Sequence, residues 1–149
     1  MALDAILSKF RNDERVQRIG TAIAGDSPAR IQLKGMAGSM DAFIASAIFK
    51  NTRHNHFFIL SDKEEAAFFQ NNLRNLLEKK DVLFFPDSFK RPGQFQQLNH
   101  TNVQLRTETI NRITNPISKA DLIVTYPEAL FEKVVSTKEL RKHTMYVKV

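Results

Sequence analysis

The sequence RIQLKGMAGSMDAFIASAIFK, residues 30–50, decides the fold that the rest of the chain must join. The apolar alternation at residues 31–33 predicts a short core strand, and Gly35 and Gly38 predict a tight turn after it. Residues 40–49 are apolar on nearly every side, which predicts a helix buried between layers. A strand, a turn and a buried helix in this order are typical of α/β folds.

The turn has the spacing of a nucleotide-binding P-loop but lacks the residues that do its chemistry. In the pattern G-x-x-x-x-G-K-[ST], the glycines allow close backbone approach, the lysine contacts the β- and γ-phosphates, and the hydroxyl binds magnesium. Gly35 fills the first glycine position, with Gly38 and Ser39 inside the turn. The second glycine, the lysine and the hydroxyl are replaced by Met40, Asp41 and Ala42.

Asp41 is the most informative replacement, because a carboxylate stands where the pattern needs a cation. Two unit charges about 4 Å apart interact by about 4 kcal/mol at an effective dielectric of ~20. Repulsion of that size lowers the affinity for a triphosphate roughly a thousandfold. Two interpretations stay open: a nucleotide-binding fold that no longer binds nucleotide in the usual way, or a plain turn unrelated to phosphate binding.

The composition fits one domain of a cytoplasmic protein. The chain has 149 residues, of which 42% are hydrophobic, enough for one core. It has no cysteine, which excludes a disulfide framework and thiolate zinc sites and suits a reducing compartment. The first residues lack the pattern of a secretory signal, and no apolar run is long enough to span a membrane, so we expect neither.

Three further apolar segments predict strands. Residues 56–60 and 82–85 are continuous apolar runs, typical of strands covered on both faces, and residues 122–125 form another. Helical patterns lie between these segments at intervals that suit parallel pairing. The predicted fold class is therefore α/β, with a mostly parallel sheet flanked by helices on both faces.

The predicted helices have recognisable starts and apolar faces. Residues 1–27 contain two short helices that we expect to pack against the sheet edge. Ser61 and Asp62 cap a helix whose apolar face is Ala66, Phe69, Leu73, Leu76 and Leu77. Residues 101–113 form a helix with Val103, Ile110 and Ile113 on one side. Pro127 opens a short last helix.

Residues 87–99 have no sustained period and predict a long loop at the carboxyl end of a strand, where α/β proteins place their functional surfaces. Lys90 and Arg91 beside Phe89 and Phe95 could form a contact with nucleic acid. The net charge of +6 would suit such a partner. The alternative is an ordinary loop whose aromatic rings pack inward while its charges stay in water.

Other site chemistry finds little support in the residues. His54 and His56 are two positions apart, but neither an H-E-x-x-H pattern nor a carboxylate cluster joins them. We therefore interpret these two histidines as ordinary polar residues at a strand edge and not as a metal site. No G-x-S-x-G elbow or G-x-G-x-x-G fingerprint occurs, so no catalytic residue is assigned.

Five pieces of the sequence, in this order and spacing, resemble one family. They are LKGMAGSMDAF (33–43), HFFILSDKEEAAFFQNNL (56–73), VLFFPDSF (82–89), LRTETINRI with Arg106 (105–113) and LIVTYPEALFEKV (122–134). Together they are similar to the amino-terminal module of bacterial transcription-repair coupling factors, which itself resembles the first helicase-like domain of the excision-repair protein UvrB. The resemblance covers residues 32–149.

The resemblance implies a particular organisation. Residues 28–135 would form a RecA-like, P-loop helicase-type lobe with a degenerate nucleotide loop, preceded by the helical segment 1–27. Residues 136–149 would connect to a following domain, and the alternating end of the chain, residues 146–149, is typical of a strand. The lobe itself would bind no cofactor, because ATP and magnesium act in the motor domains of the full-length family members.

The resemblance also implies a biological role. Such proteins displace RNA polymerase stalled at DNA lesions by ATP-driven translocation on double-stranded DNA and recruit UvrA for nucleotide excision repair. UvrA would bind through the following domain, and polymerase and DNA through others. UvrB clamps DNA with a tyrosine-rich hairpin, whereas residues 87–99 contain no tyrosine. The alternatives are the first lobe of an active UvrB-like or superfamily 2 helicase ATPase and a stand-alone nucleic-acid-binding module.

Overall fold

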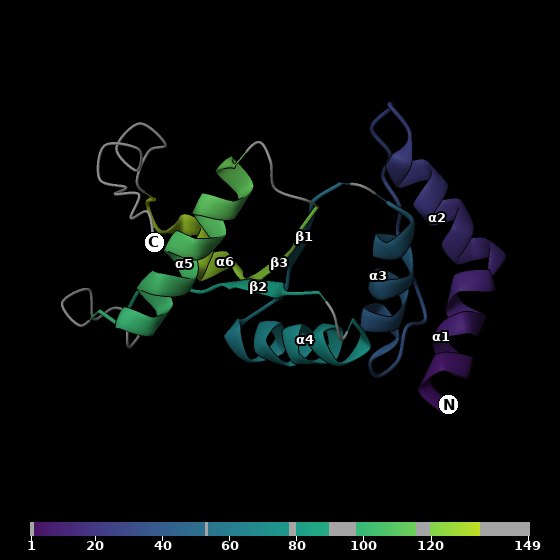
Figure 1. The fold of residues 1–149 in the computed structure, drawn as a ribbon, viewed down its shortest axis with the longest axis horizontal. Helices are drawn as coiled ribbons and strands as arrows, with labels where there is room; N and C mark the ends of the chain where they lie inside the picture. The colour runs from purple at the N-terminus through teal and green to yellow at the C-terminus, as the bar shows by residue number, and fades with distance from the viewer. Residues whose placement is uncertain (1, 53, 78–79, 90–97, 116–119, 135–149) are drawn as a thin grey trace, which may run out of the picture.

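A computed structural model describes residues 2–52, 54–77, 80–89, 98–115 and 120–134 (Figure 1). Its centre is a sheet of three parallel strands, β1 (His56–Ile59), β2 (Val82–Phe85) and β3 (Leu122–Thr125). The spatial order is β1-β3-β2, so the last strand in the sequence lies between the first two. The chain is therefore an α/β protein with a small open parallel sheet, which confirms the predicted class at this level.

Six helices are described around the sheet. They are α1 (Ala2–Asn12), α2 (Glu14–Ala24), α3 (Met40–Asn51), α4 (Lys63–Leu76), α5 (His100–Thr114) and α6 (Pro127–Phe131). Figure 1 shows α1, α2 and α3 grouped at one end of the molecule and α5 and α6 at the other, with the sheet between them. α4 packs on β2, β3 and α3, so it joins the two groups.

α4 begins and packs as the sequence predicts. The Asp62 side chain accepts a hydrogen bond from the Glu65 backbone N–H at 2.8 Å, and the Glu65 carboxylate accepts one from the Ser61 N–H at 3.1 Å. These reciprocal bonds satisfy backbone donors at the helix start. The predicted apolar face is buried throughout and consists of Ala66, Phe69, Leu73, Leu76 and Leu77.

α5 buries a polar stripe that the sequence pattern did not predict. Asn102, Arg106 and Thr109 follow one another at helical intervals and are buried. On the predicted apolar side, Ile110 packs against the main core whereas Ile113 is 44% exposed, so that side is only partly covered. The polar side chains are buried because they donate hydrogen bonds to backbone carbonyls around the end of β2. Hydrophobic periodicity does not register polar groups whose partners come from distant parts of the chain.

α1 and α2 pack on α3, and the prediction that they lie against the sheet edge was wrong. The ring of Phe10 stacks on that of Phe43 with centroids 5.1 Å apart, and Val16 packs against Ile48. The break between the two helices is real: Asp13 caps α2 by accepting from the Arg15 N–H at 2.9 Å. α3 is thus covered by α1 and α2 on one side and by α4 on another, as a nearly all-apolar helix requires.

The core strand predicted at residues 31–33 is not formed. The chain has no regular structure at residues 28–34, and Ile31 and Leu33 are 44% and 39% exposed. A strand is stabilised by a hydrogen-bonded neighbour, and no described strand lies beside this segment. The glycine turn therefore joins an irregular segment, not a strand, to α3.

β1 is covered on one face only, so the prediction of a strand buried on both faces was wrong for residues 56–60. Phe58 packs on Phe69 of α4 with ring centroids 5.1 Å apart, whereas Phe57 and Ile59 are 48% and 56% exposed. The cause is that α5 packs on β2, at the other edge of the sheet, and leaves the same face of β1 uncovered.

Some predictions fall on residues outside the described ranges. They concern Lys90, Arg91 and Phe95 in the long loop and the connecting segment 136–149. Among the helices that are described, none combines the length and the apolar character needed to cross a bilayer.

Candidate functional site

The glycine turn before α3 adopts left-handed backbone at both predicted glycines. The φ angle is +74° at Gly35 and +56° at Gly38, a region that side-chain-bearing residues rarely occupy. Ser39 precedes the helix without capping it, and its hydroxyl accepts a hydrogen bond from the Asn72 amide of α4 at 3.2 Å. The turn lies where the sequence predicts it, and this bond fixes it to α4.

Asp41 occupies the first turn of α3 with its own carboxylate. Its Oδ1 accepts a hydrogen bond from the backbone N–H of Ala42 at 2.7 Å. The first N–H groups of a helix have no partner within the helix, and these groups together with the helix dipole are what bind phosphate in nucleotide sites. The carboxylate therefore both uses a donor that a phosphate would need and places negative charge beside it.

Ala42, at the position of the magnesium ligand in the P-loop pattern, faces the hydrophobic core. Its side chain is completely buried in the same cluster as Ala45 and Leu73. Met40, by contrast, is 37% exposed. The structure brings the predicted site residues into one turn, but their side chains point in different directions and do not form a phosphate cradle.

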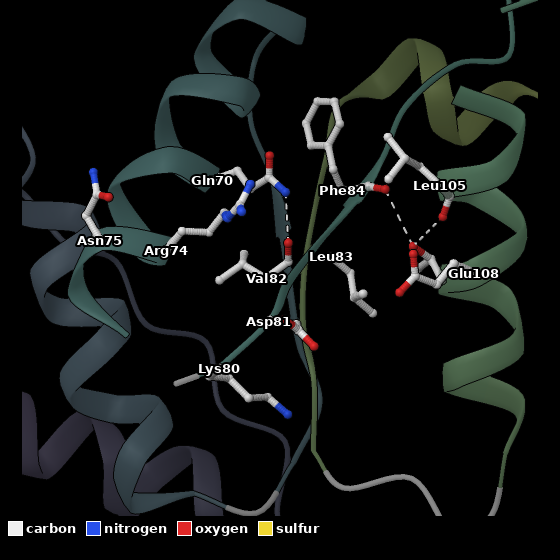
Figure 2. A pocket seen from close by; sticks show the side chains of 11 residues that line it. Gln70, Arg74, Asn75, Lys80, Asp81, Val82, Leu83, Phe84, Leu105 and Glu108 are labelled. Atoms are coloured by element: carbon white, nitrogen blue, oxygen red, sulfur yellow. Dashed lines mark hydrogen bonds between the residues drawn. The ribbon is translucent and has the colours of Figure 1, made fainter. Parts of the chain in front are cut away.

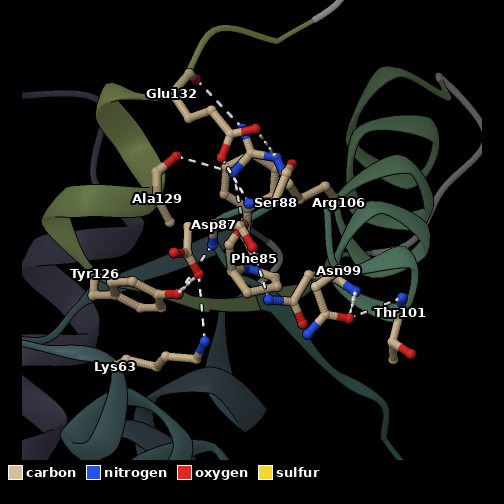
Figure 3. Close-up of polar contacts among 12 residues, drawn as sticks. Lys63, Phe85, Asp87, Ser88, Asn99, Thr101, Arg106, Tyr126, Ala129 and Glu132 are labelled. Carbon is tan, nitrogen blue, oxygen red and sulfur yellow. Dashed lines mark hydrogen bonds and ion pairs between the residues drawn. The ribbon is translucent and has the colours of Figure 1, made fainter. Parts of the chain in front are cut away.

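A polar junction joins the carboxyl ends of β2 and β3, and the sequence analysis did not predict it (Figure 3). Arg106 of α5, only 5% exposed, donates from Nη1 to the carbonyl oxygens of Pro86 at 2.7 Å and Ala129 at 3.0 Å. Its guanidinium lies 4.1 Å from the centre of the Phe85 ring, and its Nε is 3.7 Å from the Glu132 carboxylate. Burial lowers the pKa of Arg106, and the nearby Glu132 opposes that shift.

Tyr126 extends this junction toward α4 (Figure 3). Its hydroxyl donates to Asp87 Oδ1 at 2.6 Å and accepts from the Asp87 backbone N–H at 3.0 Å, while Lys63 Nζ lies 3.4 Å from the same carboxylate oxygen. Burial and the bond to Asp87 raise the pKa of the phenol. Because these groups bond to one another, the junction fixes the strand ends in place.

The ends of the long loop meet at this junction. Phe89 and Leu98 form an antiparallel bridge, and the Asn99 N–H donates to the Ser88 carbonyl at 2.8 Å. The Ser88 N–H in turn donates to the Glu132 carboxylate at 2.7 Å. Phe89 and Leu98, which flank residues 90–97 with the predicted nucleic-acid contacts, thus pair with each other.

A pocket of about 530 Å³ lies between α4, β2 and α5 (Figure 2). Its charged lining has both signs, with Arg74 and Lys80 facing Asp81 and Glu108. Lys80 is already paired with Asp121 at 3.1 Å. The pocket lines β2 from Val82 to Phe84, and its charged side chains carry both signs.

The two neighbouring histidines are placed differently. His54 is exposed, whereas His56 is half-buried, with its Nε2 2.6 Å from the Thr52 hydroxyl and its ring edge-on to Phe49 at 5.2 Å between centroids. Among the described residues, no group of three or more histidine, cysteine, aspartate or glutamate side chains is arranged to hold a metal ion. The contacts of His56 are those of a partly buried core residue.

We expect the stability of the protein to decrease in weak acid through His56. Burial, and then the charge of His54, lower the pKa of the His56 imidazole below its usual value of 6.5. The unfolded chain then binds a proton more readily than the folded one, so the free energy of unfolding falls as the pH drops through about 6.5. Urea unfolding of wild type and His56→Gln at pH values on both sides of that point checks this. The prediction would be contradicted if the free energy of unfolding of the wild type fell with decreasing pH no more steeply than that of the variant.

Comparison with known proteins assigns no family to the chain. No protein-family model matches it, and neither does any curated protein or solved structure.

Proposed function

We propose that this chain is the non-catalytic amino-terminal module of a transcription-repair coupling factor. Its α/β sheet is then a RecA-like lobe whose nucleotide loop has lost its function. In this proposal, ATP is hydrolysed by separate motor domains of a longer protein, which displaces stalled RNA polymerase and recruits UvrA. The chain shown here acts as a scaffold for those domains.

The observation that carries the proposal is the hydrogen bond from the Ala42 N–H to the Asp41 carboxylate. This bond supports the view that phosphate cannot bind at the N-terminus of α3, because a carboxylate from the first turn of the helix already occupies the site. The complete burial of Ala42 adds to this, because a magnesium ligand at that position would have to reach out of the core. The resemblance of the five sequence pieces supports the choice of family, and the turn geometry supports the proposed loss of nucleotide binding.

Isothermal titration calorimetry with ATP and magnesium tests the proposal directly. We expect no measurable binding heat with the 149-residue protein. A protein with a working P-loop serves as the positive control under the same conditions. Micromolar affinity of the wild-type chain would overturn the proposal and favour the alternative of an active helicase-like ATPase.

A second arm of this experiment restores the lysine and the hydroxyl of the P-loop pattern, but not its second glycine, with the double variant Asp41→Lys, Ala42→Thr. Because residue 42 faces the core, the new threonine hydroxyl would be buried and not directed at a metal ion. We therefore expect the double variant to remain unable to bind ATP. Asp41→Lys alone is the matched control, since it removes the carboxylate without altering the core. Binding that appears only in the double variant would show that residue 42 reaches the turn.

A further inference from the structure

A second cavity lies between α1 and the last turns of α3 and α4, at the opposite end of α3 from the glycine turn. Its volume is about 530 Å³, which is within the range of roughly 300–1,000 Å³ that small organic ligands occupy. Leu3, Leu7 and Arg11 line it from α1, because residues four apart lie on one side of a helix. Figure 1 shows α1 lying beside α3, and the two helices pack on each other.

One part of the lining is apolar. Leu7, Leu76 and Leu77 line the cavity and are buried in the main core cluster. Leu3, which also lines it, is 39% exposed. An apolar chain lying in the cavity would therefore cover apolar surface that water contacts, and the burial of such surface is favourable.

The charged part of the lining is mostly cationic. Arg11, Lys50 and Lys80 belong to the described lining together with one acid, Asp4, which already interacts with another group. Lys80 is engaged as well, since its Nζ lies 3.1 Å from the Asp121 carboxylate. Arg11 and Lys50, by contrast, form no ion pair with any residue in the described part of the chain. The cavity therefore favours a negatively charged group.

Arg11 is the more informative of these two cations. Its Nε is buried and has no hydrogen-bond partner, and no other buried side-chain nitrogen or oxygen of the described residues is in that position. Buried polar groups in folded proteins are nearly always paired. Arg11 and Lys50 both lie in the last turn of a helix, where positive charge suits the helix dipole, but the dipole does not account for an unpaired buried donor. A carboxylate in the cavity would account for it, since the donors of a guanidinium match a carboxylate in geometry.

We propose that this cavity binds a small amphiphilic carboxylate, an unbranched apolar chain that ends in a carboxylate group. The carboxylate pairs with Arg11 and Lys50, and the chain lies along Leu3, Leu7 and Leu76. The lining selects for both parts, because a short anion lacks the apolar contact and a cationic amphiphile meets like charge. This site is independent of the proposed function, since it involves neither the glycine turn nor nucleotide.

NMR titration of the isotope-labelled 149-residue protein with decanoate tests the site. We expect saturable shift changes that are largest at the amides of residues lining the cavity, such as Leu7, Thr52 and Leu77. Decyltrimethylammonium has the same chain with the opposite charge, and acetate has the same carboxylate without the chain. Each should bind at least about tenfold more weakly than decanoate, because each lacks one of the two kinds of contact.

A pair of variants tests the role of Arg11. Arg11→Gln removes the guanidinium and should weaken decanoate binding at least about tenfold, the effect of one charge-assisted hydrogen bond. Arg18→Gln is the matched control, because Arg18 is exposed on α2 and does not line the cavity, so this variant should bind decanoate as the wild type does. Both variants lose one positive charge, so net charge cannot explain a difference between them. Unchanged shifts of the β3 amides in each variant show that the fold is intact.

Four results would overturn the proposal. Decanoate shifts that do not saturate, or that gather at exposed side chains such as Phe68 and Phe131, would show that the amphiphile only coats the surface. Equal affinity for decanoate and decyltrimethylammonium would show that the cations of the cavity take no part, and equal affinity for acetate would show the same of its apolar lining. Equal affinities of Arg11→Gln and Arg18→Gln would show that Arg11 does not hold the carboxylate.

Discussion

Replacing Arg106 with alanine is expected to lower the free energy of unfolding by about 3–5 kcal/mol, the range found when one partner of a buried ionic network is removed. The guanidinium is 5% exposed and donates to the carbonyls of Pro86 and Ala129. Its removal leaves those carbonyls without this donor and the Glu132 carboxylate without its cationic partner. It also leaves a cavity beneath α5 where the guanidinium stacks on Phe85.

Urea denaturation measures the change, and Arg74→Ala is its matched control. Arg74 is an exposed arginine on α4, so its removal should alter stability by no more than about 0.5 kcal/mol. Arg106→Lys keeps the charge but not the fork of donors, so it should recover only part of the loss. A loss below about 1 kcal/mol for Arg106→Ala would mean that the junction contributes little to folding.

The elements that the sequence predicts correctly are those whose local pattern agrees with their tertiary packing. α4 is the best example, because its cap at Asp62 and its buried face both follow from spacing within about one helix length. The strands β2 and β3 are likewise found from apolar runs, since both are covered by helices or neighbouring strands. The patterns that identify these elements lie within the elements themselves, although β2 and β3 pair with each other across the chain.

The predictions from sequence are wrong where the structure of a segment depends on a partner from a distant part of the chain. The alternation of Ile31 and Leu33 predicts a strand, but a strand persists only beside another, and the described sheet offers none there. The polar stripe of α5 shows the reverse error, because polar residues that the pattern would leave in water are buried. Arg106 looks like a surface residue in the sequence and is buried because the carbonyls of Pro86, just after β2, and of Ala129 in α6 converge on it.

The candidate site falls between these cases. The sequence places Gly35, Gly38 and Asp41 in one turn, and the left-handed φ angles at both glycines agree with that. It does not show that Asp41 bonds to the first turn of α3 or that Ala42 faces inward. Side-chain direction depends on how α3 rotates against α1, α2 and α4, which is set by packing across the whole helical layer.

Leu73→Ala is expected to destabilise the protein by about 2.7–5 kcal/mol, the range for leucine truncations in a close-packed core. Leu73 has no exposed surface and lies in the main core cluster with Val124. α4 bridges α3 and the sheet, so a cavity at this position weakens both contacts at once. Urea unfolding gives the loss, and a lower slope m as well as a lower midpoint would indicate that the helical layer separates from the sheet.

Phe68→Ala is the matched control, because it removes a larger side chain from the same helix. Phe68 is 63% exposed, so its loss should change the free energy of unfolding by no more than about 0.5 kcal/mol. Equal losses in the free energy of unfolding for the two variants would mean that the face of α4 turned toward the core is not the one that the sequence spacing predicts. A large loss for Phe68→Ala alone would mean that the exposed side of α4 is covered by another surface in solution, because burial and not side-chain size decides the cost.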